Sequence, residues 1–446
     1  MPRSNTIATA CVPISHVDKI CNVTFFTSNA QNLSTRQTIA FCLLGALLAF
    51  SPLHTKVAGA AWLGFCIWGF AAFSKHRAAS RAATSAATIW LISCIVALVL
   101  ASICIFIWSE DKDILNPQMR LLVPAISAFF LLRKGGLSLQ VRNGMFHAIA
   151  LACIIAFLST AFLAIRGADV RASLASNAIP WAVAISFYPC LLLPAALAEH
   201  ASVLRRWFWL LSAACGIGAI LLAQSRGAFL ILPWCGLVYA WFWHRKQSRR
   251  ISFPQTLLML FAAVSVLLAA AWWSPSDVLR MREAAQNIKE IRTTENYNTS
   301  VGARIYIWDL AWQGIKQSPW TGIGSIERKR RIEHAGEGGS AEELAKLETV
   351  RSVGHVHNQY LNSALDGGMI GLAGLLALLI GMALTIRRLS PVDPGATWQL
   401  GGVLFMHATA SVTNVNFLHN YYVMALSLAV IVPLLAPQRQ NFAQDM

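Results

Sequence analysis

The sequence is poor in charged residues. Asp, Glu, Lys and Arg together make up 13% of the 446 residues, whereas a soluble domain carries about 25%. Hydrophobic residues account for 56%, and the mean hydropathy is +0.54. This shortage of charge excludes an ordinary soluble enzyme. It predicts a polytopic membrane protein whose polar segments are loops.

Several classes of motif are also missing. The ten cysteines stand singly, without a CxxC pair or a disulfide framework, so they are expected to act as small hydrophobic residues. No nucleic-acid-binding motif accompanies the net charge of +16. That charge is expected to follow membrane topology, and nucleic acid is not an expected partner. Neither a Rossmann glycine pattern nor a P-loop occurs, so no nucleotide-binding fold is indicated.

Long apolar runs dominate what is present. A membrane-spanning helix needs about 17–25 mostly apolar residues, and twelve spans are expected on that measure. Residues 1–36 lack the basic start, apolar run and cleavage site of a signal peptide, and we interpret them as a cytoplasmic tail. The spans lie near residues 37–53, 57–74, 87–108, 119–132, 146–165, 179–198, 206–223, 226–243, 255–273, 365–386, 398–414 and 420–437.

The distribution of positively charged residues among the loops gives an independent test of the number of spans. Lys and Arg recur in alternate loops, and every one of these loops falls on the same side if twelve spans are present. By the positive-inside rule that side is cytoplasmic, so both termini are expected inside the cell. The basic residues are Lys75, Arg77, Arg81, Arg133, Lys134, Arg142, Arg205, Arg206, Arg245, Lys246, Arg249, Arg250, Arg387 and Arg388.

These signals predict an all-α integral membrane protein with about twelve transmembrane helices and one large, partly helical periplasmic loop. Its expected divisions are an N-terminal tail at 1–36, helices 1–9 at 37–273, the periplasmic loop at 274–364, helices 10–12 at 365–437, and a cytoplasmic C-terminal tail at 438–446. Within the loop, periodicity predicts helices at 281–291, 304–317 and 341–350, a turn at 318–325 and a charged loop at 327–343.

Four arginines stand where outside loops normally avoid positive charge. Arg166 and Arg171 share a short outside loop. Arg226 lies between two spans, and Arg304 lies in the periplasmic loop. Such residues can snorkel to lipid phosphates or cap helix ends. Alternatively they bind an anionic ligand, because a guanidinium stays charged and holds phosphate bidentately. Arginines gathered at one membrane face point to the phosphate or diphosphate of a lipid.

Two histidines, His355 and His357, end the periplasmic loop just before an apolar span. Residues two apart do not share a helix face, so only one of them is expected to point into a given site. His357 can be a satisfied polar residue at a helix start, or a zinc ligand for which no third ligand is evident. It can also be a general base that titrates near the ordinary imidazole pKa of about 6.5.

Three further side chains accompany these candidates. Asn358 and Tyr360 follow His357 at the start of the apolar span. Trp308 lies one helical turn after Arg304 and shares its helix face. A tryptophan in that position can stack on a sugar ring, or it can anchor the chain at the membrane interface.

Four short stretches carry a resemblance to a known family. They are Gln224-Ser-Arg-Gly-Ala228, Gly302-Ala-Arg-Ile-Tyr-Ile-Trp308, Pro319-Trp-Thr-Gly-Ile-Gly324 and His355-Val-His-Asn-Gln-Tyr-Leu361. As a set in this order they resemble the O-antigen ligase/polymerase superfamily of membrane glycosyltransferases. The motifs cover roughly residues 200–375. The twelve expected spans with one late periplasmic loop are most similar to the O-antigen ligases.

The resemblance implies a specific reaction. Such an enzyme moves a polysaccharide from undecaprenyl diphosphate to a sugar hydroxyl of lipid A-core, at the periplasmic face of the bacterial inner membrane. The family's site residues correspond to His357 as general base and to Arg226 and Arg304 at the donor diphosphate, and Arg166 and Arg171 join them as donor-binding candidates. No cofactor or metal is implied, and direct displacement would invert the anomeric centre.

Three alternatives share parts of this pattern. An O-antigen polymerase uses the same donor with another lipid-linked glycan as acceptor, and a protein O-oligosaccharyltransferase uses a Ser or Thr hydroxyl. A transporter of lipid-linked glycan would show ionisable residues at the bilayer midplane and repeat symmetry. Apart from His407 the sequence shows neither. Arginines at one face favour an enzyme, but the residues alone do not choose the acceptor.

Overall fold

The computed structural model describes residues 49–54, 59–60, 62–64, 81–108, 115–133, 139–174, 177–198, 201–246 and 281–435. These residues form helices and turns and no strand, which confirms the all-α class for this part of the chain. The predicted spans at 37–53, 57–74 and 255–273 lie wholly or largely outside the described residues, as do both tails. The total of twelve spans therefore stays a prediction.

Each predicted span in the described part overlaps a helix. The helices are α3 (Arg81–Trp108), α4 (Asn116–Arg133), α5 (Leu139–Ile165), α7 (Ala178–Ala196), α8 (Val203–Leu222), α9 (Ile231–Lys246), α16 (Gln359–Leu389), α17 (Pro394–Ala410) and α18 (Asn420–Leu434). Short 3-10 turns, η3 (Arg226–Ala228) and η4 (Asn416–Leu418), precede α9 and α18. Among the described residues, six segments are long and apolar enough to cross a membrane. The protein is therefore a membrane protein.

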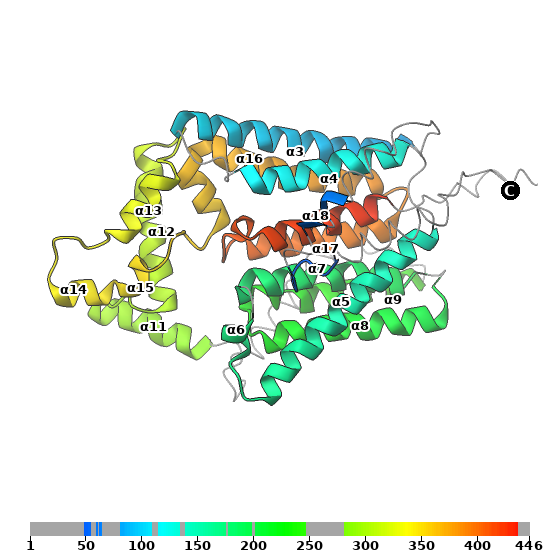
Figure 1. The fold of residues 1–446 in the computed structure, drawn as a ribbon, viewed down its shortest axis with the longest axis horizontal. Helices are drawn as coiled ribbons and strands as arrows, with labels where there is room; N and C mark the ends of the chain where they lie inside the picture. The colour runs from blue at the N-terminus through cyan, green and yellow to red at the C-terminus, as the bar shows by residue number, and fades with distance from the viewer. Residues whose placement is uncertain are drawn as a thin grey trace, which may run out of the picture.

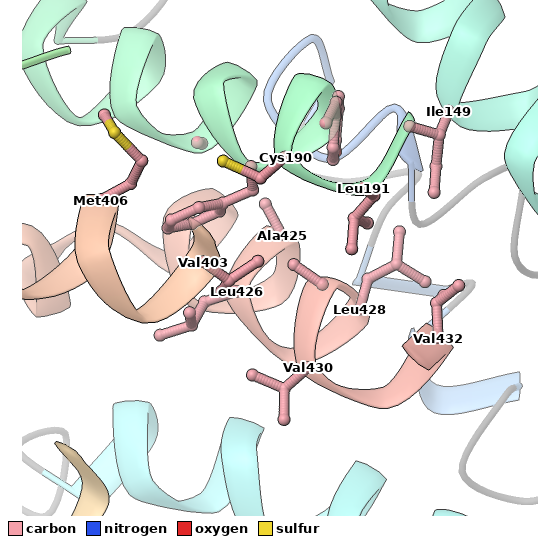
Figure 2. Packing of buried hydrophobic residues seen from close by; sticks show 14 of the residues in the cluster. Ile149, Cys190, Leu191, Val403, Met406, Ala425, Leu426, Leu428, Val430 and Val432 are labelled. Atoms are coloured by element: carbon pink, nitrogen blue, oxygen red, sulfur yellow. The ribbon is translucent and has the colours of Figure 1, made fainter. Parts of the chain in front are cut away.

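The centre of the bundle is formed by α7 and α18, which are apolar on every face. Nearly all of their side chains are buried. Figure 2 shows Cys190 and Leu191 of α7 among Val403 of α17 and Leu426 of α18. A helix that is hydrophobic all round belongs in the interior of a bundle. By contrast, Phe106 on α3 and Ile165 on α5 are each 87% exposed, as expected of a surface that lipid covers.

A second layer of helices crosses one end of the bundle (Figure 1). Its helices are α11 (Met281–Thr294), α12 (Ser300–Gln317), α13 (Ser325–Glu333), α14 (Ala341–Lys346) and α15 (Glu348–Arg351). We call residues 281–358 the polar layer. It has a small core of its own, which includes Ile307, Ile332, Val350 and Val356. The helices predicted at 281–291 and 304–317 are present, and the one predicted at 341–350 is two short helices.

The prediction of a charged loop at 327–343 was wrong for residues 327–333. Residues Ser325–Glu333 form α13, and both Arg328 and Ile332 of that helix are buried. Periodicity misses this helix because one of the two residues on its buried face is an arginine. Burial of that arginine is compensated by a carboxylate far along the chain, Asp366, whose Oδ1 lies 2.7 Å from Arg328 Nε.

Helix α16 is kinked at Gly368, inside the span predicted at 365–386. The segment Pro319–Gly324 fills the kink through backbone hydrogen bonds in both directions. The N–H groups of Ile323 and Gly324 donate to α16, and those of Met369 and Ile370 donate back, over 2.8–3.4 Å. These bonds satisfy groups that a broken helix leaves unpaired.

Glycine is required on both sides of this junction. A Cβ on Gly322 would lie 2.5 Å from the Leu365 carbonyl oxygen, and one on Gly368 would lie 2.3 Å from the Trp320 carbonyl carbon. Both glycines also have positive φ, +69° and +59°. The stretch Pro319–Gly324 therefore docks the polar layer onto α16. This helix begins at Gln359, six residues before the predicted start of the span at 365.

Candidate active site

The histidine loop, residues Val353–Asn358, joins the polar layer to α16. Its last residue caps the helix, because the Asn358 side chain accepts hydrogen bonds from the N–H groups of Tyr360 and Leu361 at 3.0 and 3.1 Å. His357 precedes this cap with a φ of +52°, a left-handed conformation that is uncommon for a residue other than glycine. The chain thus turns sharply at the histidine and enters α16 two residues later, at Gln359.

His355 and His357 are in direct contact. Their ring centroids are 4.2 Å apart with the planes at 74°, and the His357 backbone N–H donates to His355 Nδ1 at 3.3 Å. Residues 353–358 are bends and irregular backbone rather than a helix, and this conformation brings the two rings together. The expectation that only one of them points into a given site stays a prediction. The histidine pair is one structural unit.

Two side chains hold the peptide between the histidines. The Trp308 indole Nε1 donates to the Val356 carbonyl oxygen at 2.9 Å. The Val356 N–H donates to Asn362 Oδ1 at 3.4 Å. Trp308 was expected to stack on a sugar or to anchor at the interface. In the structure it ties α12 to the histidine loop.

A buried ion pair supports the loop from its other side. Arg328 is 3% exposed. It donates to Asp366 Oδ1 at 2.7 Å and also to the carbonyl oxygen of Gly354. Asn362 Nδ2 donates to the second oxygen of Asp366 at 2.9 Å. Arg328, Asn362 and Asp366 thereby connect α13, α16 and the histidine loop. Such a network is stabilising only when every member has its partners.

Three of the predicted arginines come together. Arg304 is half-buried on α12, and its pKa is lowered first by burial and then by the charges of Arg226 and Arg171. Arg226 and Arg171 therefore lie near enough to Arg304 for their charges to act on its guanidinium group. They come from α12, η3 and α6 (Val170–Ser173). We call them the arginine cluster. Glu283 of α11 approaches Arg226 to 3.9 Å at the edge of this cluster.

Arg166, the fourth predicted arginine, lies apart from this arrangement. Its side chain is exposed, and its guanidinium carbon lies 4.3 Å from the centroid of the Phe162 ring. Its charge is not among those that lower the pKa of Arg304. A role for Arg166 in donor binding stays a prediction.

The charge of Arg304 also lowers the pKa values of the two histidines. The pKa of His357 is lowered to about 3, first by burial and then by His355 and Arg304. The pKa of His355 is lowered to about 4, first by burial and then by Arg328. Both imidazoles are therefore neutral at pH 7. The expectation that His357 titrates near 6.5 was wrong for the free protein, because the sequence does not show its burial or its cationic neighbours.

Two residues beside the pair were missed by the sequence analysis. Asn414 lies near enough to His357 to raise its pKa. Among the described residues, however, neither His357 Nδ1 nor Asn414 Oδ1 has a hydrogen bond of normal geometry. The charge of His419 lowers the pKa of His355. Both residues lie in the connection between α17 and α18. The sequence does contain a signal for His419. His419 and Asn420 stand at the start of an apolar span, as His357 and Asn358 do.

Tyr360, predicted near the site, faces α17, where its hydroxyl donates to the Ala408 carbonyl oxygen at 2.9 Å. The described residues contain no group of three His, Cys, Asp or Glu side chains placed to hold a metal ion. The remaining chemistry is clear. Three guanidinium groups offer bidentate donors to a phosphate, beside a neutral imidazole that can accept a proton.

Part of the chain is similar to known proteins. Residues 211–376 match the family model described as O-antigen ligase. A stretch of 165 residues is 26% identical to an uncharacterized protein of Haemophilus influenzae and covers 36% of this chain and 38% of that relative. The matched range contains η3, the polar layer, the histidine loop and the start of α16. Residues 211–376 are therefore similar to the O-antigen ligase domain.

Proposed function

We propose that the protein is an O-antigen ligase of the inner membrane, with its active site facing the periplasm. It would transfer a polysaccharide from undecaprenyl diphosphate to a sugar hydroxyl of lipid A-core. The observation that carries the proposal is the arginine cluster beside a pair of neutral histidines, since these side chains come from elements far apart in the sequence. The family match supports a ligase- or polymerase-type reaction.

The arginine cluster would hold the donor. A lipid diphosphate is already a good leaving group and mainly requires stabilisation of its negative charge as the bond breaks. Arg226 and Arg304 would supply this as fixed cations aimed at the developing charge. Arg171 is the third member of the cluster and would also stabilise the negative charge of the diphosphate. Repulsion among the three guanidinium groups is relieved when a dianion or trianion binds between them.

His357 would act as the general base. The acceptor oxygen forms a bond to the anomeric carbon while the bond between that carbon and the diphosphate oxygen breaks. The bonding electrons leave with undecaprenyl diphosphate, and the acceptor proton passes to the imidazole and then to water. One bond forms and one breaks, so no redox partner is required. Attack from the face opposite the leaving group inverts the anomeric centre.

Donor binding would also adjust this base. With a pKa of about 3, free His357 is neutral at pH 7 but accepts a proton poorly. Arg304 is one cause of that low value, and a bound diphosphate would offset its charge. The pKa of His357 should therefore rise in the donor complex. Proton acceptance would then improve only when the donor is in place.

The alternatives differ in the acceptor or in the class of protein. A polymerase or a protein O-oligosaccharyltransferase would use the same arginines and histidine. His407, the one residue that was noted as compatible with a transporter, is buried in α17 with its Nδ1 2.7 Å from the Tyr422 hydroxyl. That contact is typical of a structural histidine rather than of a residue on a transport path.

A transfer assay separates these functions. Purified protein in vesicles would receive labelled undecaprenyl-diphosphate-linked O-antigen together with lipid A-core, a second lipid-linked glycan, or a Ser/Thr-containing peptide, each offered separately. Label on lipid A-core alone is the expected result. Label on either other acceptor would assign the polymerase or the protein-glycosylating reaction. If the donor crosses the membrane and no glycan is transferred to any acceptor, the assignment as an enzyme would be contradicted.

A further inference from the structure

Two large apolar side chains of the polar layer are exposed beside the kink of α16. Trp320 is 72% exposed, and Ile326, in the first turn of α13, is 65% exposed. Trp320 belongs to the segment Pro319–Gly324 that fills the kink, and Ile326 follows two residues after this segment. Exposed apolar side chains grouped in one short segment mark a surface that binds a partner or a membrane.

The lipid-facing surface of α16 leads to this segment. Exposed apolar side chains follow one face of the helix at helical spacing, and they are Met369, Leu376, Ile380 and Leu384. The first of them, Met369, donates its backbone N–H to the Pro319 carbonyl oxygen at 2.9 Å. The next N–H, of Ile370, donates to the Trp320 carbonyl oxygen at 3.4 Å. The face that lipid covers on α16 therefore continues onto Trp320.

Helix α3 leads to the same segment. Its exposed apolar side chains also recur at helical spacing, and they include Ile92, Val99, Ile103 and Phe106. At the end of this helix, the Trp108 indole Nε1 donates to the Thr321 carbonyl oxygen at 2.7 Å. Figure 1 shows this end of α3 next to the polar layer. Two lipid-facing helices thus end against residues 319–326.

The length of α16 places this segment at the level of the lipid headgroups. Arg387 and Arg388, in the last turn of α16, mark the opposite membrane surface. From there to Met369 the helix extends about 27 Å at 1.5 Å per residue. The hydrocarbon core of a bilayer is about 30 Å thick. Trp320, held beside Met369, therefore falls at the boundary between acyl chains and headgroups, where tryptophan is enriched in membrane proteins.

The charges of α13 suit a surface of phosphate groups. Lys329 and Arg330 are exposed about one turn after Ile326 and share its face of the helix. Three basic and two acidic residues of α13 lie outside its buried face, so this surface carries net positive charge. At a membrane surface, long basic side chains reach the phosphates while a neighbouring apolar side chain enters the acyl region.

We propose that Trp320 and Ile326 insert into the phospholipid leaflet next to the polar layer, with Lys329 and Arg330 at its phosphate groups. We call Trp320 and Ile326 the interfacial anchor. Phospholipid is the expected occupant, rather than a second copy of the chain, because the anchor continues the face of α16 that lipid covers and lies at headgroup level. This contact requires no assumption about the reaction that the protein catalyses.

The interfacial anchor also sets the level of the histidine loop. On the buried face of α13, Arg328 donates to Asp366 Oδ1 and to the Gly354 carbonyl oxygen. These contacts join the helix that carries Ile326 to the loop that carries the histidine pair. The histidine loop is thereby held close to the membrane surface, where the phosphate groups of a membrane lipid lie.

Photolabelling by lipids tests the interfacial anchor directly. Full-length protein would be placed in vesicles of phosphatidylcholine and phosphatidylglycerol that contain a trace of phospholipid with a photoreactive group. With this group in the acyl chain, labelling of Trp320, Ile326 and Met369 is expected. With it in the headgroup, labelling of Lys329 and Arg330 is expected. Neither probe should label α14, which Figure 1 shows far from the bundle.

Two variants separate insertion from chance proximity. Trp320→Glu and Ile326→Glu should each lower the labelling of residues 319–326 by the acyl-chain probe about threefold or more, because a carboxylate is excluded from the acyl region. Labelling of Phe106 on α3 should be unchanged and reports that the bundle is folded. Ala345→Glu introduces the same charge at an exposed position of α14 and should leave all labelling unchanged.

Wild-type protein in which the acyl-chain probe labels Phe106 and Ile380 but not residues 319–326 would overturn the proposal. A second copy or another protein that covered the anchor would give this same result. Labelling at the wild-type yield in both folded glutamate variants would overturn it as well. Neither measurement uses glycan transfer, so failure of the interfacial anchor and failure of the proposed function are distinguishable.

Discussion

Trp308 and Val356 are joined by a hydrogen bond of 2.9 Å from the indole Nε1 to the carbonyl oxygen. Because Arg304 lies one turn earlier on the same helix, this bond helps to hold Arg304 in place relative to the histidine pair. We expect Trp308→Phe to reduce kcat about threefold to tenfold, the effect of one lost hydrogen bond that positions the loop. Donor binding should be retained. A kcat equal to wild type would show that other contacts suffice to hold the loop.

The pH dependence should report the low pKa of His357. The neutral imidazole is the active form, and it is lost as pH falls through the pKa. For the free protein, which governs kcat/KM, that pKa is about 3. The profile of kcat/KM should therefore stay flat from about pH 8 to about pH 5. The acid limb of kcat should appear at higher pH, between about 4 and 6.5, because the bound diphosphate raises the pKa. Coincident acid limbs near pH 6.5 would contradict this electrostatic account.

The arginine cluster should depend on guanidinium geometry as well as on charge. Arg226→Lys and Arg304→Lys should each lower kcat/KM by at least about tenfold, since an ammonium group cannot make a bidentate contact with phosphate. Arg205→Lys provides the matched control, because this arginine at the start of α8 bonds to Ser202 and is not a candidate site residue. Wild-type kcat/KM in both cluster variants at equal expression would favour contacts with lipid phosphates instead.

The kink of α16 should tolerate only glycine. Gly368→Ala would place a Cβ 2.3 Å from the Trp320 carbonyl carbon, at a φ of +59°. It should lower the thermal unfolding temperature and loosen the docking of Pro319–Gly324, visible as faster proteolysis of the polar layer. Gly236→Ala is the control, because a Cβ on that residue of α9 meets nothing within 4 Å among the described residues. An unfolding temperature equal to wild type in Gly368→Ala would mean that the docking contributes little to stability.

Much of the fold is predictable from local pattern. The helices of the bundle follow from apolar runs of sufficient length, and α11 and α12 follow from periodicity. Arg226 and Arg304 are conspicuous because positive charge is unusual where they stand. Each of these signals lies within a few residues of the feature that it predicts.

The features that were missed depend on contacts between distant residues. Arg328 is a core residue only because Asp366 reaches it from α16. Asn414 approaches His357 only because the connection between α17 and α18 folds beside the histidine loop. The low pKa values of the histidine pair require both burial and neighbouring cations. None of these contacts and pKa values can be inferred from the spacing of residues along the sequence.

The most direct test of the account is His357→Ala. If His357 is the general base, transfer to lipid A-core should fall about 10²–10⁴-fold. Donor binding should persist because the arginine cluster remains, and expression should persist because Asn358, rather than the histidine, caps α16. His355→Ala removes the other ring of the pair and should reduce transfer less. A His357→Ala protein that folds, binds donor and transfers glycan at near the wild-type rate would contradict the central claim.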